Sequence, residues 1–399
     1  MDFAFTQEEL DLRQEIEEFC KEALPAGWNE EVVYWPGSYG TMPQTETEFQ
    51  EITNRFNRLL GEKGWLSLGW PKEHGGQGSA MKAAVAGDVL SYYRVPAGSI
   101  AAGIVGPTLI LVGNEELKKE FLPGIAAGEM GFWLAYSEPN AGSDLVSLKT
   151  TGVDDGDDFI VNGQKIWSTA AHVSEYGWAI VKTDMDAPAH KSATLMIIPN
   201  DTPGVTINPI INICGTHSFN EVFFDDVRVP KKYVVGEVNK GFYYVMLALQ
   251  FERMMIGAGS FRRVLEELVR YAKETVRNGH PLSEDARVRK SLAAIAVELE
   301  VFLSLYWKSA WMQDRGEVPE LEASALKLIF TELSVKMANA AVDLLGPYGL
   351  LDRGSERAPF GGRIGMGYLD SISGPIGAGT SEIQKTILAT RGLGLPRGR

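Results

Sequence analysis

The spacing of apolar residues changes twice along this chain of 399 residues. Residues 1–130 carry apolar positions at helical spacing among many charges, whereas residues 131–238 break into short runs typical of strands. Helical spacing returns over residues 239–399. The pattern therefore predicts an α+β, mainly α protein with three parts: an N-terminal helical domain, a middle β-barrel or β-sandwich domain, and a C-terminal helical bundle.

Local signals mark several of the predicted elements. Thr6 followed by Glu9 predicts a capping box at the start of the first helix. Asn162-Gly163 stands between two apolar runs and predicts the turn of a β-hairpin. In the last part, the pattern from residue 239 predicts one long helix that stops at Gly279. Further helices are predicted over residues 284–314, 319–345 and from about 380.

Composition narrows the classes of function. A net charge of −14 and a pI of about 5.0 argue against general binding to nucleic acid. We also expect no membrane-spanning helix and no secretory signal, because the chain lacks a long apolar run and a basic N-terminus. Two cysteines, Cys20 and Cys214, fit a cytoplasmic protein without disulfides, and the five histidines show no metal-binding spacing.

Three segments carry candidate chemistry. Residues 132–144 predict a strand that runs into a glycine-containing turn, whose backbone N–H groups suit a phosphate or a ring acceptor, although a simple capped turn explains them as well. The residues Trp167-Ser168-Thr169 end the next strand, and residues 219–230 close the β region. Thr380 opens the last helix as part of the run Thr-Ser-Glu-Ile-Gln.

In this order and spacing, the segments SEPNAGSD, WST and VFFDDVRVP together resemble the acyl-CoA dehydrogenase family of flavoproteins over nearly the whole chain. The resemblance implies a helical N-domain, a middle β-domain and a C-terminal four-helix bundle. It implies α,β-dehydrogenation of an acyl-CoA thioester, in which a carboxylate removes the α-proton and FAD accepts the β-hydride at N5. An electron-transferring flavoprotein is the implied electron acceptor, and the implied assembly is a homotetramer or a heterotetramer with a related subunit.

The resemblance also implies roles for individual residues. The residues implied to contact the flavin ring are Leu134, Ala135, Tyr136, Ser137, Trp167 and Thr169. Arg277 is implied to contact the FAD pyrophosphate across a subunit interface, and Thr380 and Glu382 are implied to contact the adenosine part. Ser143 matches a residue that contacts the phosphate region of CoA. By itself, Arg277 is explained equally well as an exposed charge at a helix end.

The catalytic base is unusual. Many family members carry a Glu two residues before Thr380, but here this position is Ala378, whose backbone N–H could still polarise the thioester carbonyl. A subset places the base on the first long helix of the C-terminal domain, where this chain has Glu252 followed by Arg253 in an apolar run. The resemblance implies Glu252 as base, with Arg253 and Gly377 near the substrate. A solvated or ion-paired Glu252 is the alternative.

Two departures affect the flavin site. Asp343 stands where a Gln commonly approaches the FAD pyrophosphate, and Pro347 replaces a Gly of the usual pair. They suit a half-site or non-catalytic subunit of a heteromeric enzyme, and an oxygen-reactive oxidase or monooxygenase of the same fold also stays open. Gly257 and Gly259, with Gly377 and Ala378, predict room for a bulky, branched or cyclic acyl group.

Overall fold

The protein is described here from a computed structural model, in which residues 4–28, 35–36, 46–96, 100–252 and 256–396 are described. The chain divides into two compact units. The helical unit comprises Met1–Pro43, Ser79–Val95 and Ile256–Arg399, and the sheet unit comprises Gln44–Gly78 and Pro96–Met255. Each unit is therefore assembled from segments that are distant in sequence.

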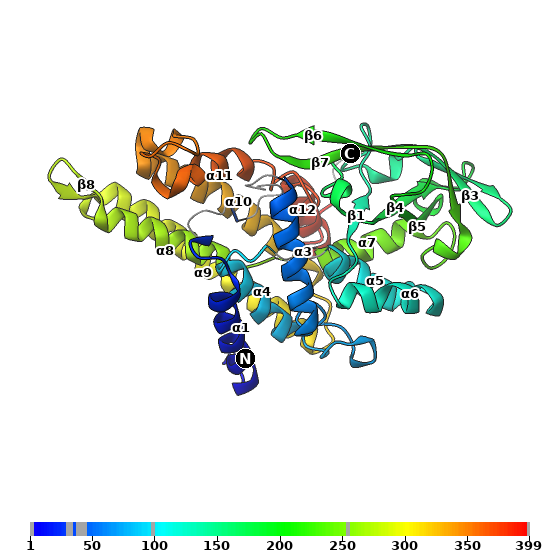
Figure 1. Cartoon of the computed structure of the whole chain (residues 1–399), viewed down its shortest axis with the longest axis horizontal. Helices are drawn as coiled ribbons and strands as arrows, with labels where there is room; N and C mark the ends of the chain where they lie inside the picture. Colours follow the sequence, from blue (N-terminus) through cyan, green and yellow to red (C-terminus); the bar gives the residue numbers. More distant parts are fainter. Residues whose placement is uncertain (1–3, 29–34, 37–45, 97–99, 253–255, 397–399) are drawn as a thin grey trace. The chain divides into compact units, whose positions relative to one another are not determined.

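A curled seven-stranded sheet dominates the sheet unit (Figure 1). The strand order is β1-β4-β2-β3-β7-β6, with β5 paired to β4. β1 and β4 are parallel, whereas the β2–β3, β3–β7, β4–β5 and β6–β7 pairs are antiparallel. The strands are β1 (Phe132–Ala135), β2 (Thr151–Asp155), β3 (Asp158–Lys165), β4 (Tyr176–Lys182), β5 (Ala193–Pro199), β6 (Val205–Ile211) and β7 (His217–Pro230).

Two hydrophobic cores stabilise this sheet. One lies between strands β1, β4 and β5 and the helical segments at one face of the sheet, and it includes Phe121, Trp178 and Leu195. The other lies inside the curl of the sheet, around Trp133 and Phe224. The helical segments of the unit are α3 (Glu46–Glu62), a π-helical turn at Ala101–Val105, α5 (Gly106–Val112), α6 (Glu115–Ala126) and α7 (Gly241–Glu252), of which α5–α7 are seen beside the sheet in Figure 1.

The hairpin predicted at Asn162-Gly163 is wrong, because both residues lie within β3. The turn of the β2–β3 hairpin instead lies at Gly156, which has a φ of 71°. Gly163 forms a bulge at which the register between β3 and β7 shifts, and it has a φ of 146°. A Cβ on Gly163 would lie 2.8 Å from that of Thr150. Gly163, which predicted a turn, is therefore required for a β-bulge and for the close approach of Thr150.

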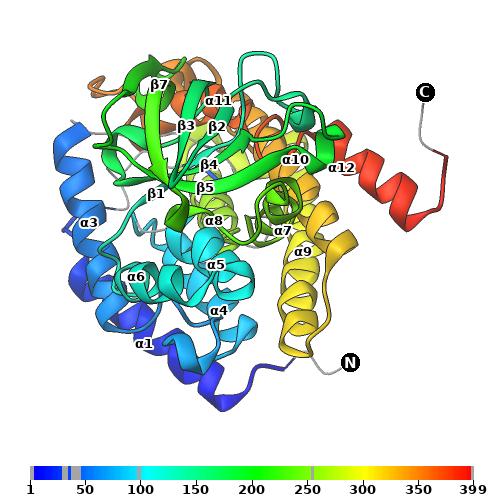
Figure 2. The same cartoon turned by 90° about the vertical axis from the view of Figure 1, so that its right-hand side faces the viewer.

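Long helices build the helical unit, and the capping box is confirmed. Thr6 accepts from the Glu9 backbone while the Glu9 side chain accepts from the Thr6 backbone. Helices α9 and α10 lie side by side, and α8 leads to a small hairpin of β8 (Val276–Arg277) and β9 (His280–Pro281) (Figures 1 and 2). The helices are α1 (Gln7–Ala23), α4 (Ala80–Tyr92), α8 (Gly259–Glu274), α9 (Ala286–Asp314), α10 (Glu320–Leu345), α11 (Arg363–Ser371) and α12 (Ser381–Ile387).

The long helix predicted from residue 239 is two helices, α7 and α8, with non-helical residues 256–258 before the second. The glycines in this region do not leave free space, contrary to the sequence-based expectation. A Cβ on Gly257 would lie 2.4 Å from the Cβ of Ser91, and one on Gly259 would lie 2.0 Å from the carbonyl oxygen of Asp88. Both glycines therefore allow α4 to approach the start of α8 closely.

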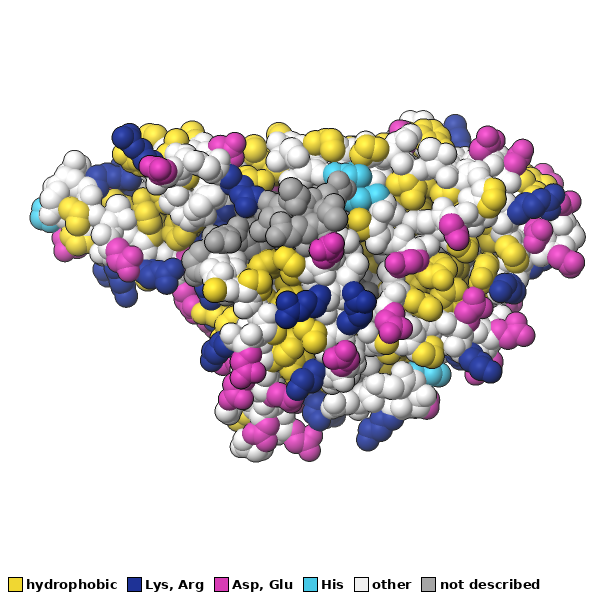
Figure 3. All heavy atoms as spheres, viewed as in Figure 1, with side chains coloured by type: hydrophobic (Ala, Val, Ile, Leu, Met, Phe, Trp, Pro, Cys, Tyr) yellow, Lys and Arg dark blue, Asp and Glu magenta, His cyan; other side chains and the backbone are white. Residues whose placement is uncertain are grey.

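Charges of both signs are interspersed over the face shown in Figure 3, without an extended area of one sign. Such mixing limits repulsion between like charges on this face. None of the described helices is both long and apolar enough to cross a membrane.

Candidate functional site

The turn after β1 and the end of β3 meet in the sheet unit. The backbone N–H of Ile166 donates to the carbonyl oxygen of Ser137 at 3.0 Å, so Trp167 follows directly beside the turn. β1 is at one end of the strand order and, among the described strands, pairs only with β4. Backbone groups on its other edge are therefore not used in the sheet. The structure thus brings the predicted ring-contacting segments, Leu134–Ser137 and Trp167–Thr169, together.

A buried ion pair holds this turn in place. The Lys165 ammonium donates to Glu138 Oε1 at 2.9 Å and to the carbonyl oxygen of Tyr136 at 3.1 Å, and its side chain is 0% exposed. Glu138 also accepts from the backbone N–H groups of Lys149 and Thr150. Burial alone would raise the pKa of Glu138, but the Lys165 ammonium and these N–H groups outweigh it and lower the pKa. The turn is therefore rigidly attached to β3.

Trp167 has an uncommon conformation for a large side chain. Its φ is 61°, and 58% of the residue is exposed although it stands beside a packed sheet. Its ring packs edge to face against Phe219 at a centroid distance of 6.2 Å. The neighbouring Ser168 is 1% exposed, and its Oγ has no hydrogen-bond partner among the described residues. Thr169 is half-buried. Such strain at an exposed aromatic ring is typical of a ligand-contacting segment.

Glu252, the residue that the resemblance implies as the base, is the last residue of a helix in the sheet unit. Helix α7 ends at Glu252 and packs against β5 and β4, the latter being the strand beside β1. The side chain of Glu252 lies outside the described part of the structure, and Arg253 lies outside the described residues altogether. Ser143 is exposed in the turn that follows β1.

In the helical unit, the loop before α12 is held by two buried polar side chains. Gln384 donates from Nε2 to the carbonyl oxygens of Ala378 and Gly379, at 3.3 and 3.1 Å. Lys327 donates to the carbonyl oxygen of Gly374 at 3.1 Å. Ala378 itself has a φ of 52°. The loop therefore presents its backbone in a defined conformation, with Gly377 and Ala378 both half-buried.

The start of α12 is capped by Thr380, whose Oγ1 accepts from the backbone N–H of Ile383 at 3.2 Å. Glu382 is exposed in the first turn, where its own backbone N–H and the Thr380 hydroxyl lower its pKa. These contacts explain both residues as parts of a helix N-terminus. The predicted contact to adenosine stays a proposal.

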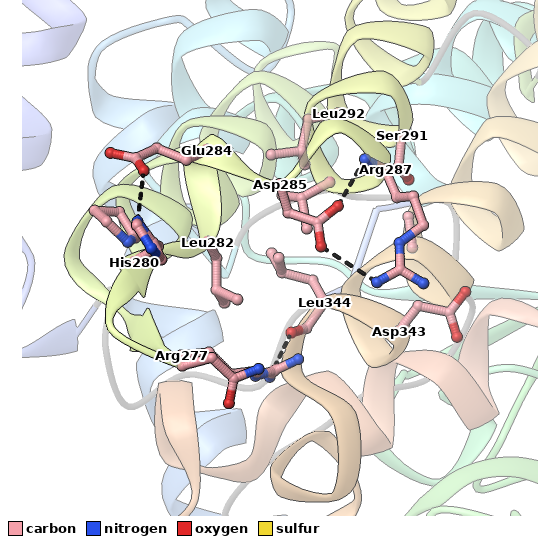
Figure 4. A pocket seen from close by; sticks show the side chains of 14 residues that line it. Arg277, His280, Leu282, Glu284, Asp285, Arg287, Ser291, Leu292, Asp343 and Leu344 are labelled. Carbon is pink, nitrogen blue, oxygen red and sulfur yellow. Dashed lines mark hydrogen bonds and ion pairs between the residues drawn. The ribbon is translucent and has the colours of Figure 1, made fainter.

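Arg277 and Asp343 line the same cavity of about 880 Å³ in the helical unit (Figure 4). Arg277 donates from Nη2 to the carbonyl oxygen of Leu344 at 3.3 Å. Arg287 pairs with Asp285 across 3.3 Å. The charged lining residues are Arg277, Arg287, Glu284, Asp285 and Asp343, with His280 beside them. Because three carboxylates face two guanidinium groups, the cavity as it stands suits a pyrophosphate poorly.

Along the chain, a sheet region lies between two helical regions, and comparison with known proteins gives the class to which this arrangement belongs. Profiles of the N-terminal, middle and C-terminal domains of acyl-CoA dehydrogenase match residues 6–129, 134–227 and 239–393. The protein named acyl-CoA dehydrogenase FadE26, from Mycobacterium tuberculosis, is 32% identical, with 100% of this chain and 99% of that protein aligned. The chain belongs to the acyl-CoA dehydrogenase family, which comprises oxidoreductases.

Two solved structures are similar over the whole length. The Tcur3481–Tcur3483 steroid ACAD has a TM-score of 0.88 at 33% identity, and 100% of each chain is covered. The ChsE4–ChsE5 complex from Mycobacterium tuberculosis has a TM-score of 0.88 at 31% identity, again with 100% of each chain covered. The name of each structure joins two chain names, and the second is described as a complex. The predicted fold class, with its helical, β and helical domains, is confirmed.

The acyl-CoA dehydrogenases are a family of flavoproteins, and the two units fit a flavin differently. In the sheet unit, three features fit a flat ring that forms hydrogen bonds. They are the edge of β1 that no described strand pairs with, the exposed ring of Trp167, and the buried Ser168 Oγ, for which the described residues offer no partner. In the helical unit, the acidic cavity around Arg277 fits a diphosphate poorly. The residues present therefore fit the ring half of a flavin better than its pyrophosphate half.

Several supporting residues escaped the sequence-based analysis. Glu138 and Lys165 lie inside segments that were noticed, but nothing in the pattern shows that they form a buried pair. His172, His217 and Asn220 come together only because β7 runs beside the segment that follows β3. No sequence signal marks Lys165, because β3 also contains the polar residues Asp158, Asn162 and Gln164.

Proposed function

We propose that the chain catalyses the α,β-dehydrogenation of an acyl-CoA thioester with bound FAD, and that Glu252 is the catalytic base. The observation that carries this proposal is the hydrogen bond from Ile166 to Ser137. It joins, after the C-terminal end of β1, the two segments that resemble the flavin-contacting segments of the family. The helix that ends at Glu252 packs on the adjacent strands of the same unit, which supports a base near that edge.

Each residue has a defined task in this proposal. Glu252 accepts the α-proton, and the backbone N–H of Ala378 donates to the thioester carbonyl as negative charge develops there. Ser143 contacts the phosphate region of CoA, and Trp167 and Thr169 flank the ring. When bound, FAD supplies the acceptor for the hydride that leaves the β-carbon. An electron-transferring flavoprotein is the proposed final acceptor.

Replacing Glu252 by Gln tests the assignment, because it removes the base and preserves size. We expect E252Q to retain FAD and acyl-CoA binding and to lose kcat by about 10²–10⁴-fold or more. E300Q is a matched control, since Glu300 is an exposed glutamate on α9. Turnover is followed with an artificial electron acceptor, and flavin bleaching by acyl-CoA under anaerobic conditions reports the chemical step. Unimpaired bleaching in E252Q would exclude Glu252 as the base.

A bulky, cyclic or branched acyl group is the proposed substrate class. Gly257 and Gly259 no longer support it, because α4 occupies the space beside them. Support comes from Gly377 and Ala378, which replace larger side chains common in the family, and from a similar solved enzyme described as a steroid ACAD. A panel of thioesters checks this class, and a sharp preference for short linear chains would contradict it.

A second candidate is a subunit that shares its flavin with a different chain. The acidic lining around Arg277 favours it, since a diphosphate needs compensating positive charge there. The two similar solved structures also carry names that join two chains, and one of them is described as a complex. The test is to count FAD per chain in protein purified alone. About one FAD per chain supports a self-sufficient enzyme, whereas half or none supports a heteromer.

A further inference from the structure

Asn220 contacts the Trp167–Thr169 segment through both its backbone and its side chain. Its carbonyl oxygen accepts from the Ser168 N–H at 3.0 Å, and its Nδ2 donates to the Ser168 carbonyl oxygen at 2.9 Å. Asn220 is 0% exposed and Ser168 is 1% exposed. Because regular pairing of β3 with β7 ends at Lys165 and Val222, these bonds continue the attachment beyond the sheet. One residue thus satisfies both backbone groups of Ser168.

The contacts of Asn220 define which way its amide points. The Ser168 carbonyl oxygen can only accept, so the atom facing it is the Nδ2 donor. The second proton of Nδ2 then points to Nδ1 of His172, 3.0 Å away, which must be the unprotonated nitrogen of that ring. Oδ1 accepts from Nε2 of His217 at 2.8 Å. The amide therefore uses both its protons and its oxygen.

The two histidines brace the amide from one side. Their rings stack with a centroid distance of 3.7 Å and an interplanar angle of 18°. His172 lies just after the Trp167–Thr169 segment, and His217 begins β7. A second backbone bond, from Ala170 N–H to the Ser218 carbonyl oxygen at 3.1 Å, closes the same connection. Within this connection, Trp167 and Ala170 have positive φ values of 61° and 57°, which are left-handed conformations.

We propose that Asn220 is a positioning residue, which holds Trp167 in its left-handed conformation with the help of the stacked pair of His172 and His217. Left-handed conformations cost free energy in residues with a side chain, so they persist only where neighbouring bonds hold them. The consequence for FAD rests on the proposed function, in which Trp167 flanks the ring. The role of Asn220 in shaping the segment does not rest on it.

Asn220→Asp tests the proposal, since Asp has the same size and cannot donate to the Ser168 carbonyl oxygen. In flavin-free protein, we expect a change in the quenching of tryptophan emission by iodide, which reaches exposed Trp167 more readily than the fully buried Trp133 and Trp178. The change should vanish in a W167F background. FAD binding, followed by titration, should weaken about ten- to hundred-fold. N208D is the matched control, because Asn208 is exposed on the adjacent strand β6.

Wild-type quenching together with wild-type FAD affinity in N220D would overturn the proposal. If N220D unfolds, His217→Phe decides instead, because it keeps an aromatic ring in the stack and removes the donor to Oδ1. Altered Trp167 quenching in H217F supports the positioning role, and unchanged quenching and affinity overturn it. A chain that binds no FAD when purified alone refutes a self-sufficient enzyme and supports the heteromer, while the quenching measurement still judges Asn220.

Discussion

Replacing Lys165 by Met would leave the carboxylate of Glu138 buried without its cation. Removing one partner of a buried ion pair costs about 3–5 kcal/mol, because the remaining charge is desolvated and unpaired. Here the carboxylate keeps the backbone N–H groups of Lys149 and Thr150 at 2.6 and 3.0 Å. We therefore expect the lower end of that range, a loss of about 3 kcal/mol in the free energy of unfolding at pH 7.

The loss of stability in K165M should depend on pH. In the wild type the pKa of Glu138 is lowered, so its contribution is present at neutral pH and is lost as the pH falls through that pKa. In K165M, burial dominates and raises the pKa, so protonation stabilises the folded variant. The difference in stability between the wild type and K165M should therefore shrink between pH 7 and pH 5.

Urea unfolding of flavin-free protein at several pH values, followed by tryptophan emission, measures both effects. K149M is the matched control, because Lys149 is an exposed lysine of the same turn and its loss should change stability by no more than about 0.5 kcal/mol. The double variant K165M/E138Q, which has no buried charge, should recover part of the loss. A loss below about 1 kcal/mol in K165M, or one independent of pH, would refute the reasoning.

Two further predictions concern the helical unit. The side chain of Glu267 is 7% exposed and pairs with Arg94 and Arg363. Burial opposes the ionisation of Glu267, but the two guanidinium groups outweigh burial and lower the pKa of Glu267 from 4.5 to about 2. Ionised Glu267 should therefore contribute about 3 kcal/mol to the free energy of unfolding above pH 4.5, and this contribution is lost on acidification toward pH 2. Acid unfolding of E267Q should lack this component. Gly259→Ala should yield unstable or insoluble protein, because its Cβ would lie 2.0 Å from the Asp88 carbonyl oxygen. G142A is the control: the space around Gly142 is open, so this variant should have the melting temperature of the wild type.

Most of the elements could be predicted from the sequence because periodicity and caps are local signals. The capping box of Thr6 and Glu9 needs only four neighbouring residues, and the alternating strands likewise show their faces directly. Besides the long helix that is in fact α7 and α8, the predictions that failed concern glycine. Gly163, Gly257 and Gly259 each fulfil a requirement set by a distant backbone, so their local context suggests a turn or free space instead.

The candidate site was accessible to sequence reasoning only where a motif carries it. The segments around Ser137 and Trp167 stand out as motifs, and the structure brings them together. Asn220 and Lys165 act through partners 52 and 27 residues away, Ser168 and Glu138. No pattern within one segment reveals such pairs, because they arise from the pairing of β3 with β7 and from the turn after β1.

The edge of β1 that is not used within the sheet has a consequence for the cofactor-free protein. Backbone groups that are not used within a sheet can pair with a strand of another molecule, which is a route to aggregation. Phe132, Trp133 and Ala135 are at most 3% exposed, however, so neighbouring segments already shield this strand. We therefore expect chains made under flavin limitation to stay dispersed and to remain able to take up the cofactor.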